Sequence, residues 1–159
     1  MIIYRIANET FKNDLSGNGA SIYGSRWNSP GRQLIHASEY ISLCMLESLV
    51  HFDKNSIPDN QYLMHISIPG IEDPKEMQHV KLKKDWQLYI EYTRWMGDQF
   101  IKAGGNLALK VPSAIVEQEY NFLINPLHAD FKKVKISRTE LLHLDTRLFH
   151  TPIARKHNQ

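Results

Sequence analysis

The sequence has a single cysteine, Cys44, and no long apolar run. One cysteine excludes an intrachain disulfide and fits a reducing compartment. No segment approaches the roughly 18 consecutive apolar residues that a membrane-spanning helix needs. The start of the chain, residues 1–5, also lacks the apolar stretch of a secretory signal peptide. We therefore expect a cytoplasmic protein that has no membrane partner.

An excess of one charge is lacking as well. The 19 Lys and Arg residues are nearly matched by 17 Asp and Glu residues, which gives a formal net charge of +2. This balance argues against nucleic acid as the main partner, because proteins that bind nucleic acid usually carry a clear basic excess.

The 159 residues suffice for one domain. We place that domain at residues 1–150 and expect the basic tail, residues 151–159, to fray.

Common cofactor and metal motifs are absent. The sequence contains neither the Gly-x-x-x-x-Gly-Lys-Ser/Thr phosphate loop nor the Gly-x-Gly-x-x-Gly dinucleotide turn. The eight histidines show no His-Glu-x-x-His spacing and no pair of cysteines accompanies them, so we expect no metal site. No Gly-x-Ser-x-Gly elbow is present either, which argues against a serine hydrolase.

Hydrophobic periodicity predicts short strands interspersed with two helices. The expected strands are residues 2–6, 34–37, 61–68, 107–111, 121–125 and 133–137. The expected helices are residues 38–51, with Ser38 as the N-cap, and residues 85–102. Residues 7–33 are rich in Asn, Gly and Ser and are expected to form a loop. Because strands and helices do not alternate regularly, the pattern favours an α+β fold.

Two polar islands interrupt the apolar pattern. The first is residues 24–28, Gly-Ser-Arg-Trp-Asn, and the second is Ser113 after Val-Pro, followed by residues 125–128. Glycine lets the backbone approach a ligand, and the guanidinium of Arg26 matches a phosphate or carboxylate. Arg26 could equally pair with a nearby carboxylate, with Trp27 as a core residue. Ser113 could bind a ligand or only close a turn.

Glu47 lies in an otherwise apolar helical run. A carboxylate is rarely buried in such a run unless it is paired or functional. Helical spacing places it on one face with Cys44 and His51. The neighbouring face, expected to be core, consists of Ile41, Met45, Leu49 and Phe52. Glu47 could be a helix-surface residue, or a general base or charge stabiliser at the edge of a pocket. Arg5, within an apolar strand, needs a partner unless it points to water.

The order of several motifs carries a family resemblance. In chain order they are Tyr4-Arg5, Gly19-Ala20, residues 24–28, Gly31, Leu46-Glu47, residues 111–114 and residues 121–128. Together they resemble the RES-domain family, over nearly the whole chain. The family takes its name from an Arg, a Glu and a Ser, which match Arg26, Glu47 and Ser113. His36 stands where many relatives have a tyrosine, and Ser25 stands where a glycine is expected.

The resemblance implies a fold, an activity and a partner. RES proteins are toxins of bacterial toxin–antitoxin pairs, and their fold is similar to that of ADP-ribosyltransferases of the diphtheria-toxin type. It implies a mixed β-sheet core flanked by helices. It also implies that NAD is the substrate and is degraded by hydrolysis or phosphorolysis of the nicotinamide–ribose bond, with phosphate as a candidate second substrate and without a metal. The implied partner is an Xre-like helix-turn-helix antitoxin, through which alone the protein would meet DNA.

The resemblance also implies roles for the catalytic residues. Arg5 and Arg26 would clamp the pyrophosphate of NAD by charge-assisted hydrogen bonds. Glu47 would stabilise the positive charge that develops on the ribose. Ser113 would hydrogen-bond the nicotinamide ribose or the amide.

Further candidates for NAD binding are Tyr4, Trp27 and His36, by stacking or hydrogen bonding. Two alternatives stay open. The same pocket could transfer ADP-ribose to a protein. Because positions 25 and 36 depart from the family pattern, the chain could instead be a non-enzymatic antitoxin-binding module of the same fold.

Overall fold

Six strands and three helices make up the described part of the computed structural model, which comprises residues 1–53, 55–70 and 81–149. The strands are β1 (Ile2–Asn8), β2 (Ile35–Ser38), β3 (Gln61–Ser67), β4 (Ala108–Pro112), β5 (Tyr120–Ile124) and β6 (Lys135–Leu141). The helices are α1 (Asn18–Tyr23), α2 (Ile41–Leu49) and α3 (Ile90–Ala103). Short 3-10 turns occupy Glu9–Phe11, Trp86–Leu88, Ala129–Lys133 and Thr146–Leu148.

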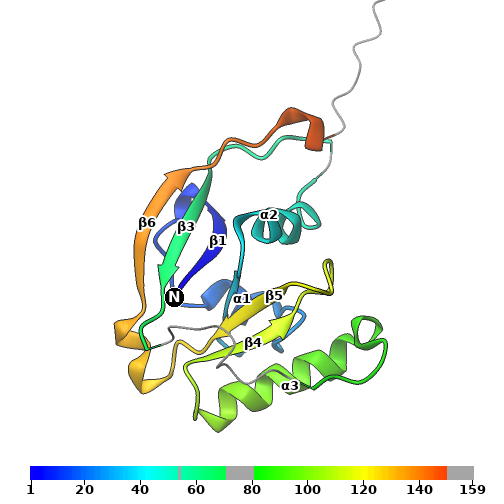
Figure 1. Ribbon diagram of the computed structural model, residues 1–159, viewed down its shortest axis with the longest axis vertical. Helices are drawn as coiled ribbons and strands as arrows, with labels where there is room; N and C mark the ends of the chain where they lie inside the picture. Colours follow the sequence, from blue (N-terminus) through cyan, green and yellow to red (C-terminus); the bar gives the residue numbers. More distant parts are fainter. Residues whose placement is uncertain (54, 71–80, 150–159) are drawn as a thin grey trace, which may run out of the picture.

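The strands form one sheet in the order β4-β5-β2-β1-β3-β6 (Figure 1). This confirms the α+β class. We expected a mixed sheet, and the five pairings among the described strands are all antiparallel. β1 pairs along its whole length with β3, but it meets β2 only at Tyr4 and Ser38. The sheet therefore has two halves, β1-β3-β6 and β2-β5-β4, which diverge on either side of this single pair.

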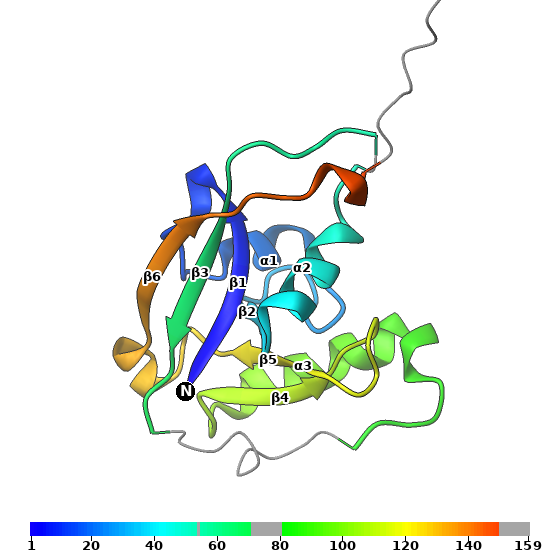
Figure 2. The same ribbon diagram turned by 45° about the horizontal axis from the view of Figure 1, so that its top comes forward.

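Two apolar clusters fix these halves. The first cluster contains side chains from all six strands, so the two halves share one core. Its buried members are Ile3, Ile35, Ala37, Met64, Ile66, Ile68, Ala108, Phe122, Ile124 and Val134, and Ile136 of β6 packs against them. α3 lies beside β4 and β5, as Figure 2 shows. The second cluster joins α3 to these strands and contains Trp27, Leu34, Trp86, Phe100, Ile101, Val111 and Leu123. Burial of such apolar area is the main favourable term in folding.

All six expected strands exist, with ends that differ by a few residues. The strand expected at residues 2–6 extends to Asn8, and the one expected at 133–137 begins at Lys135 and runs to Leu141. The loop expected over residues 7–33 was wrong in part, because it contains α1 and a 3-10 turn. The predicted fraying of residues 151–159 lies outside the described residues.

Both predicted helices begin later than expected. Ser38 is not an N-cap: it pairs with Asn121 as the last residue of β2, and α2 begins at Ile41. The buried face of α2 is formed by Leu43 and Cys44, whereas Ile41, expected in the core, is 37% exposed.

α3 begins at Ile90 because Asp85 adopts a left-handed conformation (φ 55°) and Tyr89 is not helical (φ −118°, ψ 77°). The end of α3 agrees with the predicted helix, which ends at residue 102: Gly104 caps α3 in the left-handed region (φ 62°).

Gly97 lets α3 approach the polar loop of residues 24–28. A Cβ at position 97 would lie 1.7 Å from the carbonyl oxygen of Trp27, a backbone atom. We expect Gly97→Ala to lower the free energy of unfolding by about 1–3 kcal/mol through overpacking. This is opposite in sign to the roughly 1 kcal/mol gain of a Gly→Ala change in an unobstructed helix. Thermal unfolding measures it, with Gly105→Ala as the control because no atom of the described residues lies within 4 Å of a Cβ at that position. An unchanged or higher Tm for Gly97→Ala would show that the close approach is not needed.

Candidate functional site

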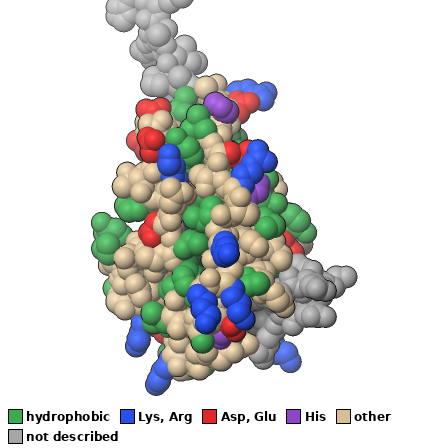
Figure 3. Space-filling model, turned by 90° about the vertical axis from the view of Figure 1, so that its left-hand side faces the viewer, with side chains coloured by type: hydrophobic (Ala, Val, Ile, Leu, Met, Phe, Trp, Pro, Cys, Tyr) green, Lys and Arg blue, Asp and Glu red, His purple; other side chains and the backbone are tan. Residues whose placement is uncertain are grey.

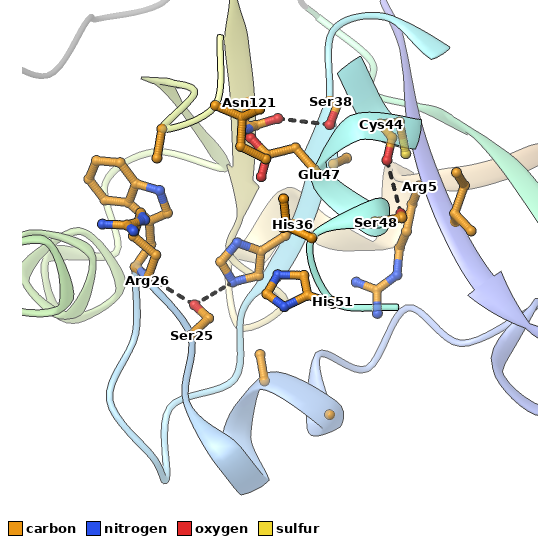
Figure 4. Close-up of a pocket in the computed structure, with 18 of the residues that line it drawn as sticks. Arg5, Ser25, Arg26, His36, Ser38, Cys44, Glu47, Ser48, His51 and Asn121 are labelled. Atoms are coloured by element: carbon orange, nitrogen blue, oxygen red, sulfur yellow. Dashed lines mark hydrogen bonds between the residues drawn. The ribbon is translucent and has the colours of Figure 1, made fainter. Parts of the chain in front are cut away.

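A cavity of about 640 Å³ lies where the two halves of the sheet diverge. Ligand pockets typically have volumes of about 300–1,000 Å³. β1 and β2 contribute facing residues, α1 and the loop after it form one wall, and α2 forms another (Figure 4). The polar or titratable side chains among its lining residues are Tyr4, Arg5, Tyr23, Ser25, Arg26, His36, Ser38, Cys44, Glu47, Ser48, His51, Gln61 and Asn121.

Glu47 is anchored by one of its two carboxylate oxygens. Oε1 accepts hydrogen bonds from Ser113 Oγ at 2.8 Å and from Asn121 Nδ2 at 2.5 Å. Asn121 Oδ1 in turn accepts a bond from Ser38 Oγ at 2.7 Å. Oε2 has no hydrogen-bond partner among the described residues. The carboxylate is thus held at the edge of the cavity with one oxygen available to a ligand.

Ser113 touches Glu47 and not the cavity. Its side chain is fully buried, and it does not line the cavity. Its hydroxyl donates to Glu47 and accepts from the backbone N–H groups of Ile115 and Val116, both at 3.0 Å. The serine therefore closes the turn after β4 and holds the carboxylate at the same time. Its predicted direct contact with NAD stays a prediction.

The loop of residues 24–28 is fixed by its own hydrogen bonds. Asn28 is fully buried, and its Nδ2 donates to the carbonyls of Ala20, Ser29 and Arg32. Its amide oxygen therefore faces Ser25, whose hydroxyl donates to it at 2.5 Å and accepts from Trp27 N at 3.0 Å. This arrangement gives the loop one defined shape and holds the Arg26 backbone at the cavity wall.

His36 carries its proton on Nε2. Nε2 lies 3.0 Å from Ser25 Oγ and 3.3 Å from Asn28 Oδ1. The amide oxygen of Asn28 can only accept, and the Ser25 hydroxyl already donates its proton to that oxygen. Nε2 must therefore be the donor in these contacts, which requires an Nε2–H group. Burial, together with the charges of Arg5 and His51, lowers the pKa of His36 to about 3. The ring is therefore neutral near pH 7, and its Nδ1 is a hydrogen-bond acceptor.

The depressed pKa of His36 should make the protein acid-sensitive. The unfolded chain binds a proton at this residue below about pH 6.5, whereas the folded protein does so only near pH 3. Stability from this residue is thus complete above pH 6.5 and is lost as pH falls toward 3. We expect Tm to fall less for His36→Gln than for the unchanged protein between about pH 7 and pH 4. Parallel Tm curves would contradict the assignment.

The two arginines differ in how they are paired. Arg26 Nη1 donates to the carbonyl of Gln87 at 3.0 Å, and its guanidinium lies 5.8 Å from the ring centre of Trp86. Arg5 makes no hydrogen bond or ion pair with the described residues, and its Nε is buried without a partner. Burial lowers the pKa of Arg5, and the charge of Asp14 opposes that shift in part. Figure 4 shows its guanidinium on the same side of the cavity as His51. Arg5, whose positive charge Asp14 offsets only in part, therefore presents that charge to the cavity.

Trp27 and Tyr4, both candidates for NAD binding, are among the residues that line the cavity. Trp27 is only 4% exposed, and its ring also packs against Trp86 in the second core cluster, with 5.5 Å between ring centres. Tyr4 lines the cavity and meets His65 edge-on at 5.1 Å. Burial raises the pKa of the Cys44 thiol to about 12, so it remains protonated and is a poor nucleophile.

Charge on the outer surface is mixed. Figure 3 shows the β6 side of the molecule, where Lys and Arg side chains stand among acidic, apolar and uncharged groups without merging into one basic surface. Ion pairs join Arg138 to Glu140 and Lys133 to Asp130.

Within the described ranges, no group of three or more His, Cys, Asp or Glu side chains could hold a metal ion, and no helix has the length and apolarity to cross a membrane.

A protein-family profile described as RES domain matches residues 2–145. This chain belongs to the RES-domain family. It is 34% identical over 137 residues to Toxin Res of Photorhabdus laumondii, covering 84% of this chain and 86% of that protein. It is 34% identical over 151 residues to Toxin Res of Pseudomonas putida, covering 94% and 100%. A third relative, the Prs ADP-ribosylating toxin of a Sphingobium species, is 33% identical over 143 residues, covering 85% and 86%.

The fold is shared with a solved toxin–antitoxin complex. The crystal structure of the MbcT–MbcA toxin–antitoxin complex from M. tuberculosis matches with a TM-score of 0.70 at 15% identity, over 89% of this chain and 83% of that one. This likeness shows that the two chains share a fold.

The RES-domain residues converge in part. Arg26 and Glu47 both line the cavity, and Ser113 joins them through Glu47. Residues 125–128, counted with the second island, do not line it: Asn125 is buried and its Oδ1 accepts from the backbone N–H of Leu127. Sequence reasoning missed Asn121, although it opens the motif at 121–128.

Proposed function

We propose that this RES domain is the toxin of a toxin–antitoxin pair and that it consumes NAD by breaking the nicotinamide–ribose bond. The observation that carries the proposal is one cavity lined by Glu47, whose Oε2 has no hydrogen-bond partner among the described residues, and by two arginines, Arg5 and Arg26. Such a cavity suits a ligand that carries negative phosphates and develops positive charge at the reacting carbon. The relatives named as toxins support the same reading.

The residue types fit the chemistry step by step. Arg5 and Arg26 would bind pyrophosphate oxygens by charge-assisted hydrogen bonds. As the bond between ribose C1′ and the nicotinamide nitrogen breaks, its electron pair leaves with the nicotinamide, which becomes neutral and needs no general acid. Glu47 Oε2 would stabilise the oxocarbenium-like ribose. Water or phosphate then bonds to C1′, and Glu47 accepts the proton when the acceptor is water.

Transfer of ADP-ribose to a protein is the second candidate. One relative is named an ADP-ribosylating toxin, and the cavity wall includes Tyr23, which is 81% exposed. A cavity bordered by so exposed an aromatic residue leaves room for an acceptor protein to reach the ribose. Glu47 would then orient the acceptor side chain in place of water.

Product analysis distinguishes these reactions. The purified protein is incubated with NAD labelled in the adenine ring, with and without phosphate and with a cell extract. Free nicotinamide with ADP-ribose indicates hydrolysis, free nicotinamide with a phosphorylated ADP-ribose indicates phosphorolysis, and a labelled protein band indicates ADP-ribosylation. Intact NAD under all three conditions would overturn the proposal and favour a non-enzymatic antitoxin-binding module.

The proposed partner is an Xre-like helix-turn-helix antitoxin. The likeness to the toxin of a toxin–antitoxin complex gives fold-level support, and DNA would then be contacted through the antitoxin. A toxin that consumes NAD would act in the cytoplasm, where its substrate is available.

A further inference from the structure

We infer that Asn121 and Ser38 are positioning residues that reserve one oxygen of Glu47 for the protein and leave the other for the substrate. The inference rests on the proposed function. Neither residue belongs to the Arg–Glu–Ser set from which the family takes its name. Their role follows from where the β2–β5 ladder ends, directly under α2.

The backbone fixes this pair before any side chain is considered. Ser38 and Asn121 are register partners in the antiparallel ladder of β2 and β5, and Ser38 is also the single point at which β2 meets β1, opposite Tyr4. Directly opposed residues in such a ladder have side chains close together on one face. The pair therefore stands at the junction of the two halves of the sheet, where the cavity begins.

The direction of the hydrogen bonds follows from the chemistry. Glu47 Oε1 accepts from Asn121 Nδ2 at 2.5 Å, and Ser38 Oγ donates to Asn121 Oδ1 at 2.7 Å. If the amide were flipped, its oxygen would face a carboxylate oxygen and both would be acceptors. Glu47 thus selects the amide orientation, and Ser38, which is 4% exposed, donates to the amide oxygen and so supports that orientation.

Glu47 Oε1 therefore has two donors, Ser113 from the turn after β4 and Asn121 from β5. These two hydrogen bonds prevent the carboxylate from rotating, so Oε2 stays turned toward the cavity. Because Ser113 is fully buried while Asn121 lines the cavity, Asn121 is the donor next to the substrate.

Asn121→Asp tests the inference through the pH profile. A protonated Asp at this position would still bridge to Glu47 Oε1, but an ionised one would oppose it with a second negative charge, and the pair would titrate together. We expect kcat for NAD consumption to stay within about threefold of the unchanged protein near pH 5.5 and to fall about 10- to 100-fold by pH 8. KM should change little. Asn125→Asp is the matched control, because Asn125 lies just after β5, away from the cavity.

Substitutions of Ser38 provide a second test. Ser38→Ala should lower kcat several-fold without changing KM, and Ser38→Thr, which keeps the hydroxyl, should restore it. A pH profile for Asn121→Asp that matches that of the unchanged protein, in a preparation that consumes NAD, would overturn this inference alone. Absence of NAD consumption by the unchanged protein would overturn the proposed function.

A readout independent of catalysis completes the test. Tm is measured for Asn121→Ala, Glu47→Gln and the double variant. Because the two residues are in direct contact, we expect the two Tm shifts to be non-additive. Additive shifts would overturn the inference whether or not the protein consumes NAD.

Discussion

Glu47→Gln is expected to lower kcat for NAD consumption by about 1,000-fold. Gln keeps the size and an oxygen that can accept from Ser113 and Asn121, but it removes the negative charge at Oε2. That charge acts only as positive charge develops on the ribose, so its loss raises the barrier and leaves ground-state binding nearly unchanged. Steady-state kinetics of nicotinamide release measure both quantities.

Glu91→Gln is the matched control, since Glu91 lies on the outer side of α3 with its side chain 82% exposed. Its activity should equal that of the unchanged protein. A Glu47→Gln variant with normal kcat would remove Glu47 from the mechanism. A large rise in KM with normal kcat would make it a binding residue only.

Arg5→Met is expected to separate binding from stability. The Nε of Arg5 is buried without a hydrogen-bond partner among the described residues, and a buried charge that is only partly compensated destabilises the folded state. Met has a similar length and no charge, so Tm should rise or stay equal. Loss of a charge-assisted hydrogen bond to a phosphate oxygen should raise KM for NAD by roughly 10- to 100-fold. Thermal unfolding and initial-rate kinetics on the same preparations measure the two effects.

The control for Arg5→Met is Arg32→Met, which makes the same chemical change at an exposed position. KM should not change there. A lower Tm for Arg5→Met with an unchanged KM would show that Arg5 is structural, supported by Asp14, and that the anion binds elsewhere.

Sequence reasoning located the strands better than the helix starts. Alternating apolar residues define a strand face directly, and all six strands appeared. The start of α2 was misplaced because Ser38 is equally good as a cap or as a strand residue, and only its pairing with Asn121 decides. The start of α3 was misplaced because the left-handed turn at Asp85 leaves no periodic signal.

The site was predictable as a set of residues but not as a geometry. Arg26 and Glu47 could be named from their motifs, and both line the cavity. That Trp27 is core, that Ser113 faces Glu47, and that Asn121 completes the support depend on contacts between segments far apart in the chain. Asn121 lies 74 residues from Glu47 in sequence, so no local pattern indicates their contact.

One measurement tests the central claim, that a single cavity binds NAD and breaks it at Glu47. NAD binding by calorimetry and nicotinamide release by chromatography are followed in parallel for the unchanged protein and for Glu47→Gln. The account predicts that the unchanged protein releases nicotinamide as NAD disappears, and that Glu47→Gln binds NAD with similar affinity and leaves it intact. Intact NAD with the unchanged protein, or equal nicotinamide release by both proteins, would contradict it.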